Sequence, residues 1–269
     1  MAAARTFLAG IALAAMLALT GQPAGAGPDG PVRALADGGQ ATVTEIVDGD
    51  TVLLADGREV RLVGIQAPKL PLGRTNFRKW PLADRARSAL ATLTLGRTVS
   101  LFYGGRRVDR HSRQLAHLML DDGRWVQRVL LSQGLARVYS FPDNRALVAE
   151  MLAAERAARA ARAGIWGDGF YAIRSPAGLT RDIGTFQLVE GRVLDAARVR
   201  GTTYLNFGED WRTDFTIVVR NDSRAAFEEA GVDLLALQGR MVRVRGWLDN
   251  WNGPMIAATH PEQVEVLTD

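Results

Sequence analysis

The feature that most constrains the fold is a series of short β-type segments separated by glycine turns. "TVTEIV" alternates polar and apolar residues from residue 42, and "TVLLA" resumes after the break at "DGD". Asp56-Gly57 is a strong hairpin signal, and "REVRLVGI" follows as the return strand. This pattern predicts an antiparallel meander of short strands. On the return strand, Arg61 and Val63 share one face.

Helix signals are inserted into this meander and also follow it. Pro81 can begin a helix with an apolar face, and Gly96 can end it. Residues 98–103 and 113–120 are predicted strands, and residues 125–133 and 144–163 are predicted helices. Meandering strands with inserted and trailing helices indicate a small five-stranded barrel of mixed α+β class that is mostly β.

A second β-rich unit follows a stretch without periodicity. Residues 168–185 carry Gly, Pro, Ser and mixed charge and are predicted to be a linker. Residues 186–269 contain strand and helix signals in the order β-β-β-α-β-β. This order predicts a second barrel of the OB (oligonucleotide/oligosaccharide-binding) type, after a first domain at 40–167.

The first 26 residues have the pattern of a signal peptide. Arg5 precedes a 13-residue apolar stretch, and Ala24-Gly25-Ala26 is a small-x-small cleavage signal. The apolar stretch is shorter than the about 20 residues of a membrane-spanning helix, although an uncleaved anchor is the alternative. The sequence contains no cysteine and therefore no disulfide framework or lipid-attachment site. We expect a secreted or periplasmic protein without a membrane span after cleavage.

The cationic charge is almost entirely arginine. The formal net charge is +4, and Lys69 and Lys79 are the only lysines. A genome bias toward arginine accounts for this composition, and so does a surface that binds phosphates. Composition does not decide between the two.

Two pairs of residues in the first unit have the chemistry of a phosphodiester site. Asp48 and Asp50 flank a glycine, so both carboxylates can crowd one bend, where a hard cation such as Ca²⁺ finds oxygen ligands. An ordinary turn is the alternative. Arg61 and Arg113 come from different strands and together can clamp a phosphate. Unrelated surface arginines are the alternative for this second pair.

Taken in order, these segments resemble the staphylococcal-nuclease-like (thermonuclease) family. The resemblance covers about residues 42–167 and rests on "DGDTVLL", "VRLVGIQAPK", "GRRVDRHSRQLAHLML", "VQRVLLSQGLARVY" and "AERAARAARAGIWG". It implies an OB-type barrel with helices that cleaves DNA and RNA phosphodiesters using Ca²⁺. In that family two acids bind the metal, a glutamate is the usual candidate base, and two arginines hold the phosphate.

The resemblance carries over to four residues of this chain. Asp50 matches the first metal-binding acid, and Asp48 matches a carboxylate beside the metal. Arg61 and Arg113 match the phosphate clamp. The resemblance therefore implies that the phosphate-binding half of the site is retained.

The departures from the family fall in the loop "QAPK", where the family usually has D-[AT]-P-E. Gln66 replaces the second metal ligand, and Lys69 replaces the candidate base. The two changes make the site more positive by three charges. A lost general base commonly costs about 10²–10⁴-fold in rate. We therefore expect Ca²⁺ binding and Ca²⁺-dependent cleavage to be weak or absent.

Further basic and aromatic residues are candidates for nucleic-acid contacts. Arginines at 156, 159 and 162 recur at helical spacing and are predicted to form a solvated face, with a binding surface as the alternative. Aromatic residues interleaved with arginines suit single-stranded nucleic acid, since bases stack on such rings; burial in the core is the alternative. The candidates are Tyr139, Phe141, Tyr204, Trp211, Arg212 and Trp251, and Trp247 belongs to the same interleaved set in the second unit.

Three functions remain open at this point. The first is an exported protein that binds DNA, RNA or a similar polyanion with little hydrolysis. The second is an active nuclease with a rearranged site, in which Lys69 stabilises developing charge or Glu45 or Asp48 completes a metal site. The third is an envelope module that binds protein or polysaccharide partners.

Overall fold

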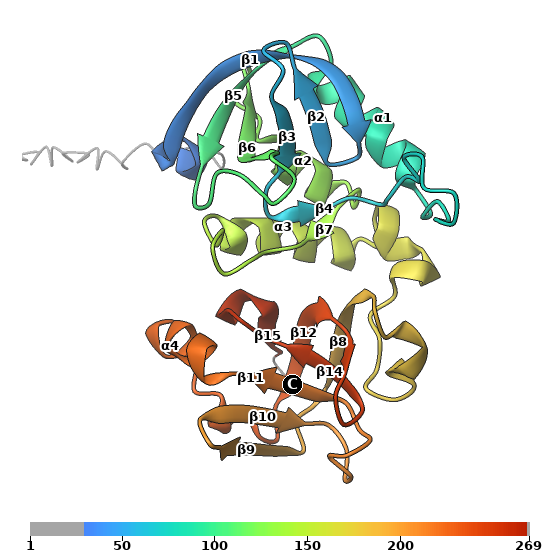
Figure 1. The fold of residues 1–269 in the computed structure, drawn as a ribbon, viewed down its shortest axis with the longest axis vertical. Coiled ribbons are helices and arrows are strands. Elements are labelled where there is room, and N and C mark those ends of the chain that lie inside the picture. Colours follow the sequence, from blue (N-terminus) through green and yellow to red (C-terminus); the bar gives the residue numbers. More distant parts are fainter. Residues whose placement is uncertain (1–29, 268–269) are drawn as a thin grey trace, which may run out of the picture.

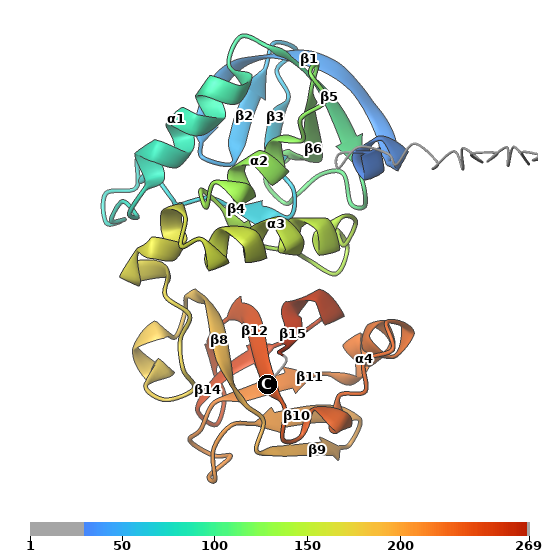
Figure 2. The same cartoon turned by 180° about the vertical axis from the view of Figure 1, so that it is seen from behind.

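The computed structural model describes residues 30–267, so the predicted signal peptide at 1–26 lies outside the described residues. Two folded units are stacked along the long axis, and helix α3 (Val148–Ala160) lies between them (Figures 1 and 2). Each unit has its own hydrophobic core. No helix within the described residues is long and apolar enough to cross a bilayer.

The first unit is the predicted five-stranded barrel. Its strands are closed in the order β1-β2-β3-β6-β5. Strands β3 and β6 pair in parallel, and the other pairs are antiparallel. The strands are β1 (Ala36–Asp48), β2 (Thr51–Leu54), β3 (Glu59–Leu62), β5 (Thr98–Tyr103) and β6 (Gln114–Leu120).

The long first strand closes the barrel by pairing on both sides. Residues 36–42 of β1 pair with β5, and residues 43–48 pair with β2. The register with β5 shifts between Asp37 and Gln40, where Gly39 has a φ of 77°. A bulge of this kind bends a strand and increases its twist, and glycine adopts the positive φ at little cost. Because the bulge accommodates Gly39 within the strand, β1 begins at residue 36. The sequence pattern indicated a start at residue 42.

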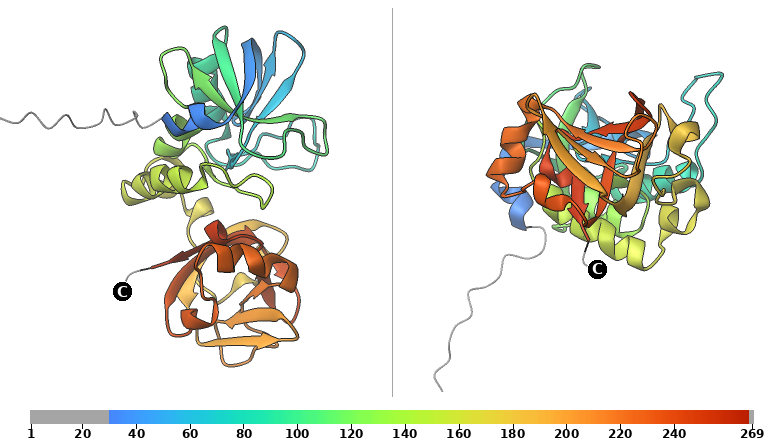
Figure 3. Two further views of the ribbon diagram at one scale, coloured as in Figure 1. Left: turned by 90° about the vertical axis from the view of Figure 1, so that its left-hand side faces the viewer. Right: turned by 90° about the horizontal axis from the view of Figure 1, so that it is seen from below.

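Three helices and a small strand pair cover the barrel. They are α1 (Ala83–Thr94), α2 (Val126–Ser132) and α3, and Figure 3 shows the last two on the side of the second unit. Leu90, Leu130 and Met151, one from each helix, are fully buried in the barrel core. Strand β4 (Ile65–Gln66) pairs with β7 (Arg137–Val138) and so joins the "QAPK" loop to the segment before α3.

The second unit has the connectivity of the first, although its strands form two sheets. The five-stranded sheet has the order β13-β14-β11-β10-β9, and the three-stranded sheet has the order β15-β12-β8. Its elements are β8 (Phe186–Arg192), β9 (Asp195–Val199), β10 (Thr202–Asn206), β11 (Thr216–Val219), α4 (Asn221–Glu229), β12 (Met241–Trp247), β13 (Asp249–Asn250), β14 (Pro254–Ala257) and β15 (Val264–Val266).

The shared connectivity is seen strand by strand. Residues 186–199, interrupted at 193–194, pair with both β12 and β10, as β1 pairs with β5 and β2. Strands β11 and β14 pair in parallel, as β3 and β6 do. Helix α4 occupies the same place in the order as α1. The second unit therefore has OB-type connectivity, as predicted, but not a closed ring of strands.

The predicted linker is a packed connection. Residues 168–185 include two short 3-10 helices, η3 (Gly169–Tyr171) and η4 (Leu179–Asp182). The Tyr171 hydroxyl donates to the Pro81 carbonyl at 2.7 Å, and Leu179 belongs to the core of the second unit. The segment is therefore an ordered connection that packs against both units.

A buried ion-pair network joins the two units. Arg245 of β12 contacts Glu155 of α3 at 2.9 Å and Glu265 of β15 at 2.7 Å, and its side chain is only 1% exposed. Arg159, from the predicted arginine face, contacts the same Glu265 at 3.2 Å and is 10% exposed. At Arg159, this face is thus neither solvated nor open to nucleic acid, because it holds the second unit.

We predict that Arg245→Met lowers the free energy of unfolding by about 3–5 kcal/mol, because it leaves the buried Glu155 carboxylate without its main counterion. Urea denaturation measures this loss. Asp84→Asn, which breaks an exposed pair with Lys79, should change stability by less than about 0.5 kcal/mol. A loss of similar size in both variants would contradict the role of the network.

Stability should also fall in mild acid because of His117. This residue of β6 packs against Trp125, and its Nδ1 atom has no hydrogen-bond partner. Burial lowers its pKa from 6.5 to about 3, so below pH 6.5 the unfolded chain binds a proton that the folded chain does not. Between pH 7.5 and pH 5.0 we expect a loss of about 2 kcal/mol from this residue.

Urea denaturation of the protein and of His117→Leu at the two pH values checks this. The variant should lose about 2 kcal/mol less than the parent on acidification. The variant should still become less stable on acidification, but by a smaller amount than the parent. This remaining loss comes from His260, because burial lowers its pKa to about 4. An equal loss of unfolding free energy in both proteins between pH 7.5 and pH 5.0 would contradict the prediction.

Candidate functional site

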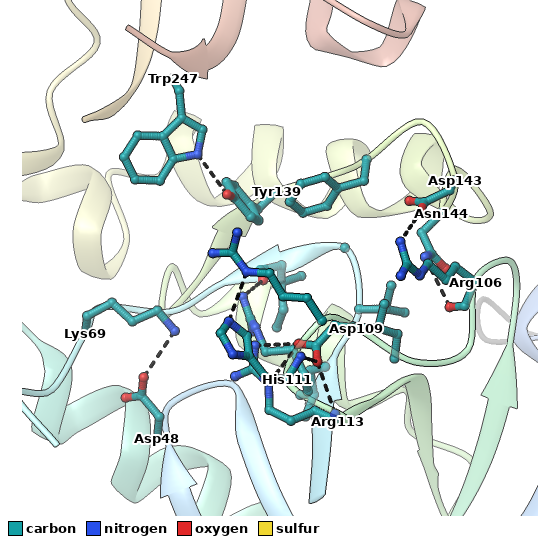
Figure 4. Close-up of a pocket in the computed structure, with 18 of the residues that line it drawn as sticks. Asp48, Lys69, Arg106, Asp109, His111, Arg113, Tyr139, Asp143, Asn144 and Trp247 are labelled. Atoms are coloured by element: carbon teal, nitrogen blue, oxygen red, sulfur yellow. Dashed lines mark hydrogen bonds and ion pairs between the residues drawn. The ribbon is translucent and has the colours of Figure 1, made fainter. Parts of the chain in front are cut away.

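A pocket of about 680 Å³ opens where one end of the barrel meets the segment before α3. Figure 4 shows Lys69 and Asp48 on one side, Asp109, His111 and Arg113 at the centre, and Tyr139 with Trp247 above them. The described lining residues are Asp48, Arg61, Leu62, Val63, Gly64, Ile65, Lys69, Leu72, Arg74, Arg106, Asp109, Arg110, His111, Arg113, Leu115, Tyr139, Phe141, Asp143, Asn144 and Trp247. Most of the residues predicted from the first unit therefore meet here.

The bend between β1 and β2 places Asp48 in the lining of this pocket and Asp50 behind it, bonded to Lys69. A Cβ atom at Gly49 would lie 2.8 Å from Ala67 and 2.9 Å from the Cβ of Ala86 in α1, so only glycine fits there without displacement. The close approach packs the bend against the "QAPK" loop. Asp48 and Asp50 are both buried, at 3% and 0% exposure.

The Lys69 ammonium group binds both of these carboxylates. Its Nζ atom lies 3.1 Å from Oδ2 of Asp48 and 2.7 Å from Oδ2 of Asp50. It also donates to Oδ1 of Asp50 at 2.8 Å. The lysine side chain is 20% exposed, so the ion pair lies at the edge of the pocket. The residue that the resemblance predicts at the base position thus acts here as a counterion to the predicted metal-binding acids.

Asp50 is the most strongly paired acid of the site. Burial alone would raise its pKa, but the positive charges of Arg61 and Lys69 and the hydrogen bonds from Lys69 and the Ala67 N–H outweigh burial. The pKa of Asp50 therefore lies below its ordinary value, and the group stays ionised. The Ala67 N–H donates to it at 2.7 Å, which ties the loop to the bend.

The two arginines of the predicted phosphate clamp line the same pocket, but both have protein partners. Arg61 contacts Asp50 at 2.8 Å and donates to the Ile65 carbonyl at 2.7 Å, and its side chain is 11% exposed. Arg113 uses Nε and Nη2 to bind Asp109 at 2.9 and 2.6 Å, and its side chain is 27% exposed. Arg113 is therefore the more accessible of the two.

Gln66, which the resemblance predicts at the second metal-ligand position, faces a buried arginine. Its Oε1 atom accepts from Nε and Nη2 of Arg137 at 3.0 and 2.7 Å. Burial lowers the pKa of Arg137 to about 10, and its guanidinium lies 4.6 Å from the centre of the Phe186 ring. The amide oxygen thus satisfies a cation that belongs to the interface between the units.

These contacts do not fit a bound Ca²⁺ ion. An ion ligated by Asp48 and Asp50 would need the space beside their oxygens that Lys69 Nζ fills. Two unit charges about 4 Å apart repel by about 4 kcal/mol at an effective dielectric near 20, and a divalent ion meets about twice that. Among the described residues, no group of three or more His, Cys, Asp or Glu side chains is placed to hold a metal.

The second-unit residues predicted to bind nucleic acid do not line this pocket. Trp211 and Trp251 are 50% and 70% exposed, and the Arg212 guanidinium lies 4.5 Å from the centre of the Trp211 ring. Their loops meet where Gly253 approaches the Thr213 carbonyl. Tyr204 is half-buried on β10. Their role in binding stays a prediction.

Sequence reasoning counted Trp247 among the second-unit aromatic residues but did not place it at this pocket, which it lines from the second unit. A signal was available, because along β12 the buried Val242 and Val244 alternate with residues of the other face, on which Trp247 lies. A large aromatic residue on that face would have marked a contact surface. Its location beside Tyr139, however, depends on how the two units pack.

Comparison with known proteins finds sequence matches to the first unit. A model of the staphylococcal nuclease homologue family matches residues 59–168. "Protein ParB" of Escherichia coli is 34% identical over 137 residues, which cover 47% of this chain and 71% of that protein. An "Uncharacterized endonuclease" of Escherichia coli O157:H7 is 31% identical over 129 residues, covering 47% of this chain and 76% of its own length.

The chain belongs to the staphylococcal nuclease homologue family. The predicted resemblance and the barrel are thereby confirmed. Membership supports nucleic-acid binding or hydrolysis at the level of the family. The family match runs from β3 to the end of the first unit, whereas Trp247 extends the pocket with a residue of the second.

We predict that Lys69→Glu makes the protein responsive to Ca²⁺. The change removes the competing ammonium and adds a carboxylate beside Asp48 and Asp50, which creates an oxygen-rich site. Thermal unfolding with CaCl₂ and with EDTA measures the response. Calcium should raise the Tm of the variant and leave that of the parent unchanged.

Lys79→Glu is the matched control, because it makes the same charge change at an exposed pair outside this pocket. It should show no calcium response. A parent protein stabilised by calcium as strongly as Lys69→Glu would contradict the assignment of Lys69 as the resident cation.

Proposed function

We propose that this protein binds nucleic acid through its phosphates in the pocket and does so without Ca²⁺-dependent phosphodiester hydrolysis. The observation that carries the proposal is the Lys69 ammonium group bonded to both Asp48 and Asp50. The acids that would serve a metal are neutralised by a residue of the chain. Binding at the site then needs no metal ion to overcome repulsion between carboxylates and phosphate.

The charge of the pocket supports an anionic ligand. Its lining includes six basic side chains and three carboxylates, so the walls carry a net positive charge. The six are Arg61, Lys69, Arg74, Arg106, Arg110 and Arg113, and the three are Asp48, Asp109 and Asp143. Clefts lined with one sign of charge concentrate oppositely charged ligands. A polyphosphate backbone matches this surface because its charges repeat along the chain.

The absence of hydrolysis follows from the state of Lys69. An ammonium group that donates hydrogen bonds to two carboxylates has no lone pair with which to accept a proton from water. The loss of a positioned general base commonly slows a reaction by about 10²–10⁴-fold. The pocket retains groups that hold a phosphate but lacks a group at this position that activates water. We also propose, from the signal pattern of residues 1–26, that binding takes place in the periplasm or outside the cell.

The test combines a binding assay with a cleavage assay on the same single-stranded DNA and RNA. We expect the protein to bind both and leave both intact in CaCl₂ and in EDTA. Affinity should fall steeply with salt, since each neutralised phosphate adds about 0.7 to the slope of log K against log salt for single strands. Cleavage that needs calcium would instead support an active nuclease, and no binding at low salt would favour a protein or polysaccharide partner.

We predict that Arg113→Met weakens binding to DNA and RNA alike and reduces that salt slope by about 0.7–1. The reason is the loss of the more accessible clamp arginine. Fluorescence anisotropy titrations at several salt concentrations measure both quantities. Arg124→Met removes an equal charge outside the pocket lining and should leave the slope unchanged. Equal effects of the two substitutions would mean that binding follows overall charge and not the pocket.

A further inference from the structure

Trp247 is the one residue of the second unit among the described residues that line the pocket. It ends strand β12, and Figure 4 shows it reaching from the second unit toward Tyr139. Its side chain is 48% exposed. A tryptophan that only filled the interface would be enclosed, as Trp125 is at 1% exposure in the barrel core. About half of the indole surface therefore remains available to a ligand.

Two contacts fix the position of this indole. Its Nε1–H donates to the Tyr139 hydroxyl at 2.8 Å. Two residues earlier on the same strand, Arg245 is anchored to Glu155 and donates to the Val138 carbonyl at 3.3 Å. The strand that carries Trp247 is thus pinned to the segment that carries Tyr139. Because the indole is held by its edge, its faces are not used by this hydrogen bond.

Trp247 also completes an aromatic wall that begins in the first unit. Tyr139 packs edge-on against Phe141 and Phe186, with ring centres 4.9 and 4.8 Å apart. Phe186 is the cross-strand partner of Trp247 in the β8–β12 pair. Phe141 is 47% exposed and Phe186 is buried, so the wall offers ring surface at Phe141 and Trp247. Tyr139, Phe141 and Trp247 of this wall border the same pocket as the basic residues.

We propose that Trp247 stacks on a base of the nucleic acid whose phosphates bind at Arg113 and Lys69, so that the binding site is built from both units. This inference rests on the proposed function and adds a residue and a domain to it. The bound base must be unpaired, since a base stacked within a duplex has no free face for the indole. Tyr139 is a positioning residue that orients the indole, and the hydrogen bond reduces the side-chain freedom lost on binding.

The experiment compares two labelled probes of equal length on the full-length protein in EDTA at one salt concentration. One is a single-stranded oligothymidylate, and the other is an abasic deoxyribose-phosphate strand with the same phosphates. Trp247→Ala should weaken oligothymidylate binding by roughly 5- to 150-fold, the range for loss of one base–aromatic stack. Binding of the abasic strand should be unchanged. Trp247→Phe should restore most of the affinity, because it keeps a ring for stacking.

Tyr139→Phe separates positioning from stacking. It removes the hydroxyl that accepts from Trp247 but keeps the ring that packs against Phe141 and Phe186. We expect a smaller loss for oligothymidylate than Trp247→Ala gives and none for the abasic strand. In the double variant Tyr139→Phe, Trp247→Ala, the loss should equal that of Trp247→Ala alone, because Tyr139 acts through the indole.

The outcomes distinguish this inference from the proposed function. If the parent protein binds neither probe, the proposed function fails, and the inference fails with it. If the parent binds both and Trp247→Ala binds oligothymidylate equally well, the inference alone is wrong, and Trp247 is an interface residue. Equal weakening for both probes would also overturn it, because the effect would then come from displacement of the second unit.

Discussion

A buried carboxylate, that of Asp50, holds together the segments that form the pocket. It lies in the bend after β1 and binds Arg61 from β3, the Ala67 N–H and the Lys69 ammonium group. A charge with no exposed surface is tolerated only when it is paired and hydrogen-bonded. The strand, the bend and the loop are therefore fixed relative to one another by the electrostatic requirement of one residue. This requirement places Lys69 at the edge of the pocket.

The second constraint is that one buried face of α3 contacts both units. Met151 packs into the barrel core, while Glu155, four residues later, is paired with Arg245 of the second unit. A buried glutamate on a helix between two folded units needs a cation from one of them. Since β12 supplies that cation, its last residue, Trp247, lies at the pocket. The pocket therefore contains Trp247 because β12 of the second unit is attached to α3 through Arg245.

Local patterns predicted much of the fold because strands, turns and helices leave short-range signals. The alternation from residue 42 and the Asp56-Gly57 turn correspond to β1, β2 and β3. The resemblance to the nuclease family identified five residues that meet at one site, including Asp48 and Lys69. The missed contacts join residues far apart in sequence, and their partners depend on the packing of whole units. Gln66 and Arg137 are 71 residues apart, and Tyr139 and Trp247 are 108 apart.

Gln66 and Lys69, the two residues at which the loop departs from the predicted family pattern, both have charged partners within the protein. Lys69 neutralises the acids of the bend, and Gln66 satisfies Arg137, which lies against Phe186 at the interface of the two units. An aspartate at position 66 would face this buried guanidinium, which would compete for its charge. Gln66→Asp alone would therefore not supply a free metal ligand at this position. In this chain the centre of the site and the attachment of the second unit are linked through Arg137.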